Sequence, residues 1–128
     1  MKSLWVERVI LRVPKDEVFT RSIITKYHRN LKRGLVLGDI AYSDTAFYLI
    51  VPDEALSTAF LYGVYLKARE RGLDAEAMYA TIVDLDAVLP EDVKKAGIAW
   101  SSRRLSKEEI SSLKNKFITS SLLEVIFR

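Results

Sequence analysis

The stretch LVLGDIAYSDTAFYLIV, residues 35–51, decides how this 128-residue chain folds. It holds two apolar runs, at 35–42 and 45–51, on either side of a polar turn at Ser43 and Asp44. Serine and aspartate favour tight turns, so the pattern predicts a hairpin of two antiparallel strands. The second run is apolar on both faces, which is typical of a central strand that is covered on both sides of its sheet.

The segments around this hairpin predict an alternating order of strands and helices. An amphipathic helix is expected before it, over residues 16–33, and a second helix after it, over residues 53–71. Strand-like patterns at 4–13 and 77–86 lie outside these helices. The first two-thirds of the chain therefore follow the order β-α-β-β-α-β.

The last third of the chain predicts two short helices and a strand. Pro90 opens the first helix, which ends at Gly97. Ser106 and Glu109 have the spacing of a capping box, which opens the second helix. Residues 122–127 are rich in strand-forming side chains and predict a closing strand.

We therefore expect an α+β fold with a ferredoxin-like β-α-β-β-α-β order, helices on one sheet face, and a C-terminal helix-helix-strand extension. A single domain is expected over residues 1–128, with the core at 1–88 and the extension packed on it at 89–128. An α/β layer with a parallel strand pair is the alternative. Because this superfold hosts many unrelated activities, the fold alone does not name a function.

The composition restricts the chemistry and the environment of the protein. Cysteine is absent, which excludes disulfides, thiolate zinc sites and cysteine nucleophiles. Glutamine is absent and asparagine is rare, which is typical of thermophilic proteins and also arises by chance in a short chain. The first residues show no signal-peptide pattern, and no apolar run is long enough to span a bilayer. We therefore expect a cytoplasmic protein without membrane contact.

Charge is distributed unevenly along the chain. Residues 1–33 carry nine bases and three acids, residues 34–93 carry three and eleven, and residues 94–128 carry eight and three. Basic segments of this kind form nucleic-acid footprints in some proteins and face acidic segments, of the same or another subunit, in others. A mixed and solvated surface is the third interpretation.

A basic stripe is expected on the outer face of the first helix. Arg21, Arg29 and Lys32 share that face at helical spacing. Such a stripe would neutralise phosphates and bind nucleic acid weakly, without sequence preference. The predicted nucleic-acid contacts are Arg21, Arg29, Lys32, Arg103, Arg104 and Lys107.

The sheet face opposite the helices is a second candidate surface. It is expected to carry Arg8, Ile10, Arg12, Tyr48 and Ile50. RNA-binding modules of this topology stack bases on aromatic side chains at such positions, although the Gly-flanked aromatic pattern of their third strand is missing at 45–51. Coverage by the C-terminal segment or by a dimer partner is the competing interpretation.

The second helix is apolar nearly all round, which predicts burial on both sides or contact with a partner. Leu56, Phe60 and their neighbours form its expected inner face. The residues of the predicted interface lie on the opposite side and are Leu61, Val64, Tyr65 and Ala68. We therefore expect a homo-oligomer.

Catalytic signals are weak. The single histidine, His28, has no orienting acid or nucleophile nearby in the sequence. Asp84 and Asp86 share one face of a strand end, and Asp39 could join them in a carboxylate cluster that holds Mg²⁺. No cofactor is expected, because no Gly-rich phosphate loop opens a helix.

Two classes of function follow from these patterns. The first is a non-catalytic binding or assembly protein that self-associates and contacts RNA or DNA through a basic helix face. The alternative is a metal-dependent hydrolase or nuclease that uses the carboxylate cluster. Charge segregation and the missing catalytic constellation favour the first class.

Overall fold

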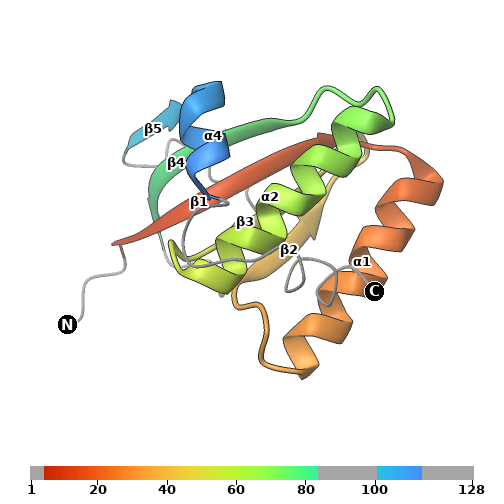
Figure 1. The fold of residues 1–128 in the computed structure, drawn as a ribbon, viewed down its shortest axis with the longest axis horizontal. Coiled ribbons are helices and arrows are strands. Elements are labelled where there is room, and N and C mark those ends of the chain that lie inside the picture. Colours follow the sequence, from red (N-terminus) through yellow and green to blue (C-terminus); the bar gives the residue numbers. More distant parts are fainter. Residues whose placement is uncertain (1–4, 84–100, 114–128) are drawn as a thin grey trace.

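The structure is a computed structural model that describes residues 5–83 and 101–113. These residues form an α+β fold with a five-stranded antiparallel sheet and three helices (Figure 1). The strands are β1 (Trp5–Pro14), β2 (Asp39–Tyr42), β3 (Ala46–Val51), β4 (Glu76–Val83) and β5 (Ser101–Arg104). The helices are α1 (Glu17–Lys32), α2 (Ala55–Glu70) and α4 (Lys107–Leu113).

The strands lie in the order β2-β3-β1-β4-β5. Each neighbouring pair is antiparallel, so the alternative with a parallel strand pair is wrong for the described sheet. The predicted ferredoxin-like order is not confirmed, because a fifth strand, β5, extends the sheet beside β4. The predicted helix at 90–97 and the predicted strand at 122–127 lie outside the described residues.

β5 is a strand that the sequence did not predict. Its four residues, Ser101–Arg104, are polar throughout and show no strand-like apolar pattern. The segment pairs with β4 along one side, with Tyr79 opposite Arg103. A short edge strand needs backbone hydrogen bonds along that side only and no alternation of apolar side chains, which explains why the pattern missed it.

Local side chains determine where the helices begin. Asp16 precedes α1, and its Oδ1 accepts a hydrogen bond from the backbone N–H of Phe19 at 2.9 Å. The predicted capping box before α4 is confirmed, because the Glu109 N–H donates to Ser106 Oγ at 3.2 Å and the Ser106 N–H donates to Glu109 Oε1 at 3.1 Å. α2 begins after Glu54, whose carboxylate accepts from the backbone N–H of the second helical residue.

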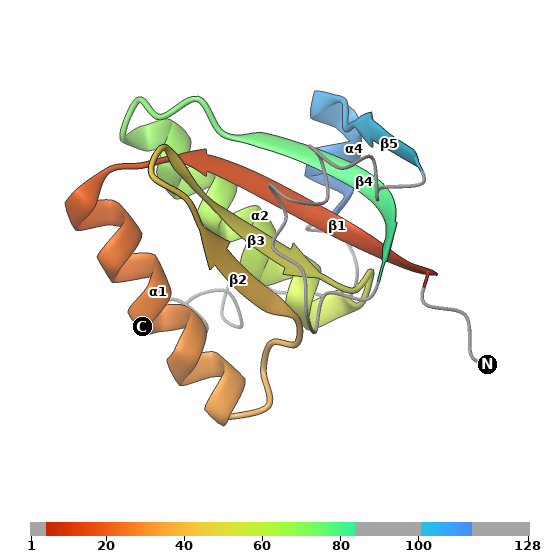
Figure 2. The same cartoon turned by 180° about the vertical axis from the view of Figure 1, so that it is seen from behind.

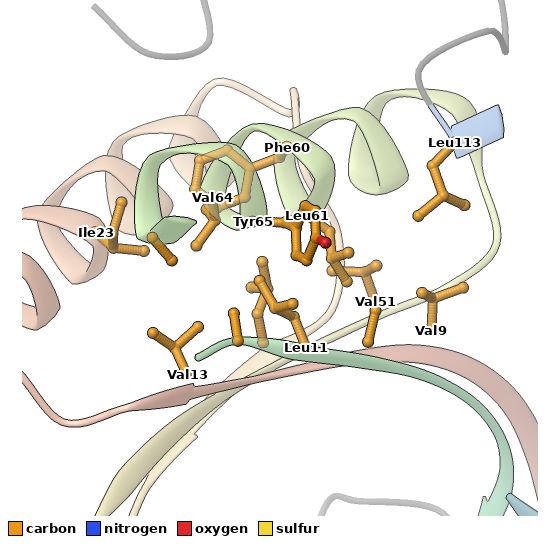
Figure 3. Packing of buried hydrophobic residues seen from close by; sticks show 14 of the residues in the cluster. Val9, Leu11, Val13, Ile23, Val51, Phe60, Leu61, Val64, Tyr65 and Leu113 are labelled. Atoms are coloured by element: carbon orange, nitrogen blue, oxygen red, sulfur yellow. The ribbon is translucent and has the colours of Figure 1, made fainter. Parts of the chain in front are cut away.

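The hydrophobic core lies between one face of the sheet and the three helices. Alternate residues of β1 and β3 point into it, and all three helices contribute side chains (Figure 3). Its members include Val9, Leu11, Val13, Ile23, Phe47, Val51, Phe60, Leu61 and Leu113. The helices therefore pack on one face of the sheet, as predicted from the sequence. This packing fixes the position of α1 and leaves its outer surface exposed.

The structure buries the residues of the predicted α2 interface inside the single chain, where the sequence had placed them on the outer face of the helix. Leu61, Val64 and Ala68 are fully buried in the core of the single chain, and Tyr65 is 8% exposed. The reason is that α2 crosses the sheet between α1 and α4, so it is covered on several sides (Figure 1). On the α1 side, the rings of Tyr27 and Phe60 have centroids 6.3 Å apart. Intramolecular neighbours thus account for the apolar surface that suggested a partner.

The sheet face opposite the helices is also buried at its centre. Ile10 lies between Ile50 and Met78 in the register of β3, β1 and β4. Ile10, Tyr48 and Ile50 are 5%, 4% and 1% exposed, respectively. The Tyr48 ring therefore offers no surface for base stacking, which agrees with coverage of this face by protein.

Candidate nucleic-acid interface

α1 holds its basic side chains on the surface because its other side is anchored in the core. Phe19, Ile23 and Tyr27 are buried against the sheet and α2. The residues about half a turn away are exposed, namely Arg21, His28, Arg29 and Lys32. We call the three bases Arg21, Arg29 and Lys32 the basic stripe. Arg21 and Lys32 are eleven positions apart, so the stripe extends for about 16 Å along the helix.

The charges of the basic stripe are accessible to an anionic ligand. Arg21 Nη2 lies 3.2 Å from Glu17 Oε1, but the two side chains are 74% and 82% exposed. Exposed pairs of this kind contribute little free energy, so a phosphate can displace the carboxylate. Arg29 and Lys32 lie in the last helical turn, where positive side chains complement the helix dipole. Glu17 is the single acid within α1.

The helix is fixed to the sheet by polar contacts as well as by its core residues. The Tyr27 hydroxyl donates to the Gly38 carbonyl at 2.6 Å, which connects the middle of α1 to the start of β2. Burial raises the pKa of Tyr27 to about 12, so its hydroxyl remains a donor at neutral pH. Arg71 Nε donates to Asp16 Oδ2 at 3.1 Å, which connects the end of α2 to the start of α1.

The remaining predicted contacts lie at the opposite edge of the sheet. Arg103 and Arg104 are on β5 and Lys107 begins α4, whereas α1 lies beside β2 (Figures 1 and 2). All three side chains are exposed. The structure therefore brings the six predicted residues together as two separate groups of three.

At this second edge, two of the three bases form ion pairs with carboxylates. Arg103 Nη1 lies 2.7 Å from Glu109 Oε2, and its guanidinium carbon lies 5.9 Å from the centroid of the Tyr79 ring. The Ser106 backbone N–H and Arg103 hold the pKa of Glu109 below its usual range, so this carboxylate stays ionised. Arg104 Nη1 lies 3.7 Å from Glu76 Oε1. The local positive charge is therefore largely compensated.

A hollow of about 750 Å³ lies beside this second group, between the end of α2, β4 and the start of α4. Its charged lining residues are three bases and three acids: Arg69, Arg104, Lys107, Asp74, Glu76 and Glu109. Tyr65 contributes its hydroxyl, which accepts a hydrogen bond from Arg69 at 2.9 Å. Balanced charge makes this hollow a poor site for a polyanion.

The carboxylates of the predicted metal cluster are not assembled within the part of the chain that the structure describes. Asp39 is exposed on the edge strand β2, and Asp84 and Asp86 lie outside the described residues. Among residues 5–83 and 101–113, no three His, Asp or Glu side chains are grouped so that they could hold a metal ion.

The sequence did not predict a second set of bases beside α1. Lys26 lies on α1, and Lys67 and Arg71 lie at the end of α2, where a hollow of about 400 Å³ separates the two helices. The spacing of Lys67 and Arg71, four residues apart, places them on one helix face. That face could be recognised from the sequence, but its position next to Lys26 depends on how the two helices pack.

Comparisons with models of protein families, with curated proteins and with solved structures found no match to the chain. Among the helices that the structure describes, none is both long enough and apolar enough to cross a membrane.

Proposed function

We propose that this protein is a non-catalytic binding protein that contacts RNA or DNA through the basic stripe of α1. The observation that supports this most directly is the exposed alignment of Arg21, Arg29 and Lys32 on a helix that is anchored from behind. Phosphate neutralisation by such side chains releases counterions and gives binding without sequence preference. The contact is assigned to α1 because Glu17 is the single acid within that helix, whereas Glu109 and Glu76 pair with Arg103 and Arg104 at the far edge.

Fluorescence anisotropy with labelled single-stranded RNA and duplex DNA tests this proposal. The wild-type protein should bind at low salt, and the triple variant Arg21→Ala, Arg29→Ala, Lys32→Ala should lose most of that affinity. The variant Arg103→Ala, Arg104→Ala, Lys107→Ala removes the same charge at the other edge and is the control. Equal losses in both variants would assign binding to net charge instead of to α1.

We also propose that the first four strands and two helices form a ferredoxin-like unit. Support comes from the order β2-β3-β1-β4 within the larger sheet and from the placement of α1 and α2 on one face. β5 and α4 then belong to an extension that packs on this unit, with Ile110 and Leu113 in the common core. An experimental structure in which β1 does not pair with both β3 and β4 would contradict this assignment.

A further inference from the structure

Two hollows adjoin along α1 and share Ser22 and Lys26 in their linings. The outer hollow, of about 280 Å³, is lined entirely by α1 residues: Val18, Arg21, Ser22, Thr25, Lys26 and Arg29. The inner hollow, of about 400 Å³, lies between α1 and α2 and is lined by Phe19, Ser22, Ile23, Lys26, Lys67, Glu70 and Arg71. We call the two together the α1–α2 groove.

Positive charge dominates this groove. Five of its lining residues are bases, and Glu70 is the one acid among them. Lys26 stands where the hollows meet, and its Nζ donates to Ser22 Oγ at 3.2 Å. The Arg71 side chain is 44% exposed although it pairs with Asp16. The floor of the inner hollow is apolar and closed, because Phe19 and Ile23 are buried.

We infer that the α1–α2 groove takes the sugar-phosphate backbone of a single strand, so that the protein prefers single-stranded nucleic acid to duplex. This inference rests on the proposed function. Lys26, Lys67 and Arg71 supply cationic contacts inside a concave surface, which is the arrangement that tracks a flexible backbone. Phosphates of a stiff duplex lie on a convex cylinder, so they reach the exposed bases of α1, including Arg21 and Arg29 of the outer hollow, without entering the inner hollow between the two helices.

The lining of the groove also indicates that binding does not depend on the base sequence of the strand. Contacts from lysine and arginine to phosphates carry no sequence information. The Phe19 ring is 7% exposed and gives no platform on which a base could stack. We therefore expect single strands of different base composition to bind with similar affinity.

Anisotropy with a labelled single strand and with the duplex of the same sequence tests the inference. Lys26→Ala with Lys67→Ala should weaken single-strand binding on the order of tenfold and leave duplex binding nearly unchanged. Lys32→Ala with Arg33→Ala removes the same charge from the end of α1, outside both hollows, and should weaken both ligands alike. Glu70→Gln removes the acid of the groove and should strengthen single-strand binding selectively.

The outcomes separate the inference from the proposed function. If the Lys26 and Lys67 variant weakens both ligands equally, or neither, the groove does not select single strands while binding by α1 still stands. If Glu70→Gln leaves single-strand affinity unchanged, the groove is not on the path of the strand. If the wild-type protein binds no nucleic acid at low salt, both proposals are wrong.

Discussion

Gly38 has a backbone conformation that side chains other than glycine rarely adopt, with φ of +113°. A Cβ at this position would overlap the backbone oxygen of Ile50 and lie 2.9 Å from the Val51 Cα. The Gly38 carbonyl also accepts the hydrogen bond from Tyr27. This residue therefore fixes β2 against β3 and fixes α1 against both.

Substitution of Gly38 should cost much more stability than substitution of Gly34. Gly34 has φ of +72°, but a Cβ there meets no atom within 4 Å, so Gly34→Ala should lower the free energy of unfolding by about 1 kcal/mol. Gly38→Ala adds a backbone clash and should cost several times as much. Denaturant unfolding of both variants checks this, and equal losses would contradict the geometry at Gly38.

Asp16 should make stability fall at acid pH. The hydrogen bond from Arg71, together with the backbone N–H of Phe19, holds the pKa of Asp16 below its ordinary value of 3.8. The unfolded state therefore takes up the proton first, so the stabilisation is complete above pH 3.8 and is lost as the pH falls through the lower folded pKa.

Asp16→Asn tests this pH dependence. The amide oxygen can still accept the Phe19 N–H, but it carries no charge for Arg71. The variant should therefore lose less stability than the wild type between neutral pH and about pH 3, as followed by urea unfolding. Parallel loss in both proteins would show that Asp16 does not contribute to the acid sensitivity.

At the scale of the elements, α2 depends strongly on its neighbours, because nine of its sixteen residues are buried. Leu61 is fully buried, so Leu61→Ala should cost about 2–5 kcal/mol, and Leu61→Glu should abolish the thermal unfolding transition. Leu66 lies on the same helix but is 40% exposed, so Leu66→Glu should leave the fold intact. Circular dichroism distinguishes these results. A folded Leu61→Glu protein would restore the earlier interpretation of Leu61 as an outward-facing residue.

The elements also show which features a sequence can predict. The starts of α1 and α4 were predictable, because Asp16, Ser106 and Glu109 form hydrogen bonds with residues only three positions away in the sequence. The orientation of α2 could not be predicted, because a helix with apolar residues on all sides does not reveal which neighbouring element covers each side. β5 was missed because its polar residues pair with β4 through the backbone.

At the scale of the whole molecule, the distribution of bases along the sequence does not give their distribution in space. Arg21 and Arg103 both belong to basic segments, yet Arg21 is on α1, beside β2, and Arg103 is on β5, so the two elements that carry them lie at opposite sides of the sheet (Figure 2). The pairing of Arg104 with Glu76 joins residues far apart in the chain and depends on the antiparallel register of β4 and β5. The α1–α2 groove likewise exists only because two helices pack side by side. The exposure of the α1 bases, in contrast, followed from helical periodicity alone.

The salt dependence of single-strand binding tests the central claim, namely that α1 binds phosphates, most directly. For the wild type, the logarithm of the association constant should fall linearly with the logarithm of salt concentration. Substitution of Arg21, Arg29 and Lys32 by alanine should reduce the magnitude of that slope by about 2, because each phosphate contact on a single strand contributes about 0.7. The control variant at Arg103, Arg104 and Lys107 should keep the wild-type slope. An unchanged slope in the α1 variant, or an equal decrease in the control, would contradict the proposed interface.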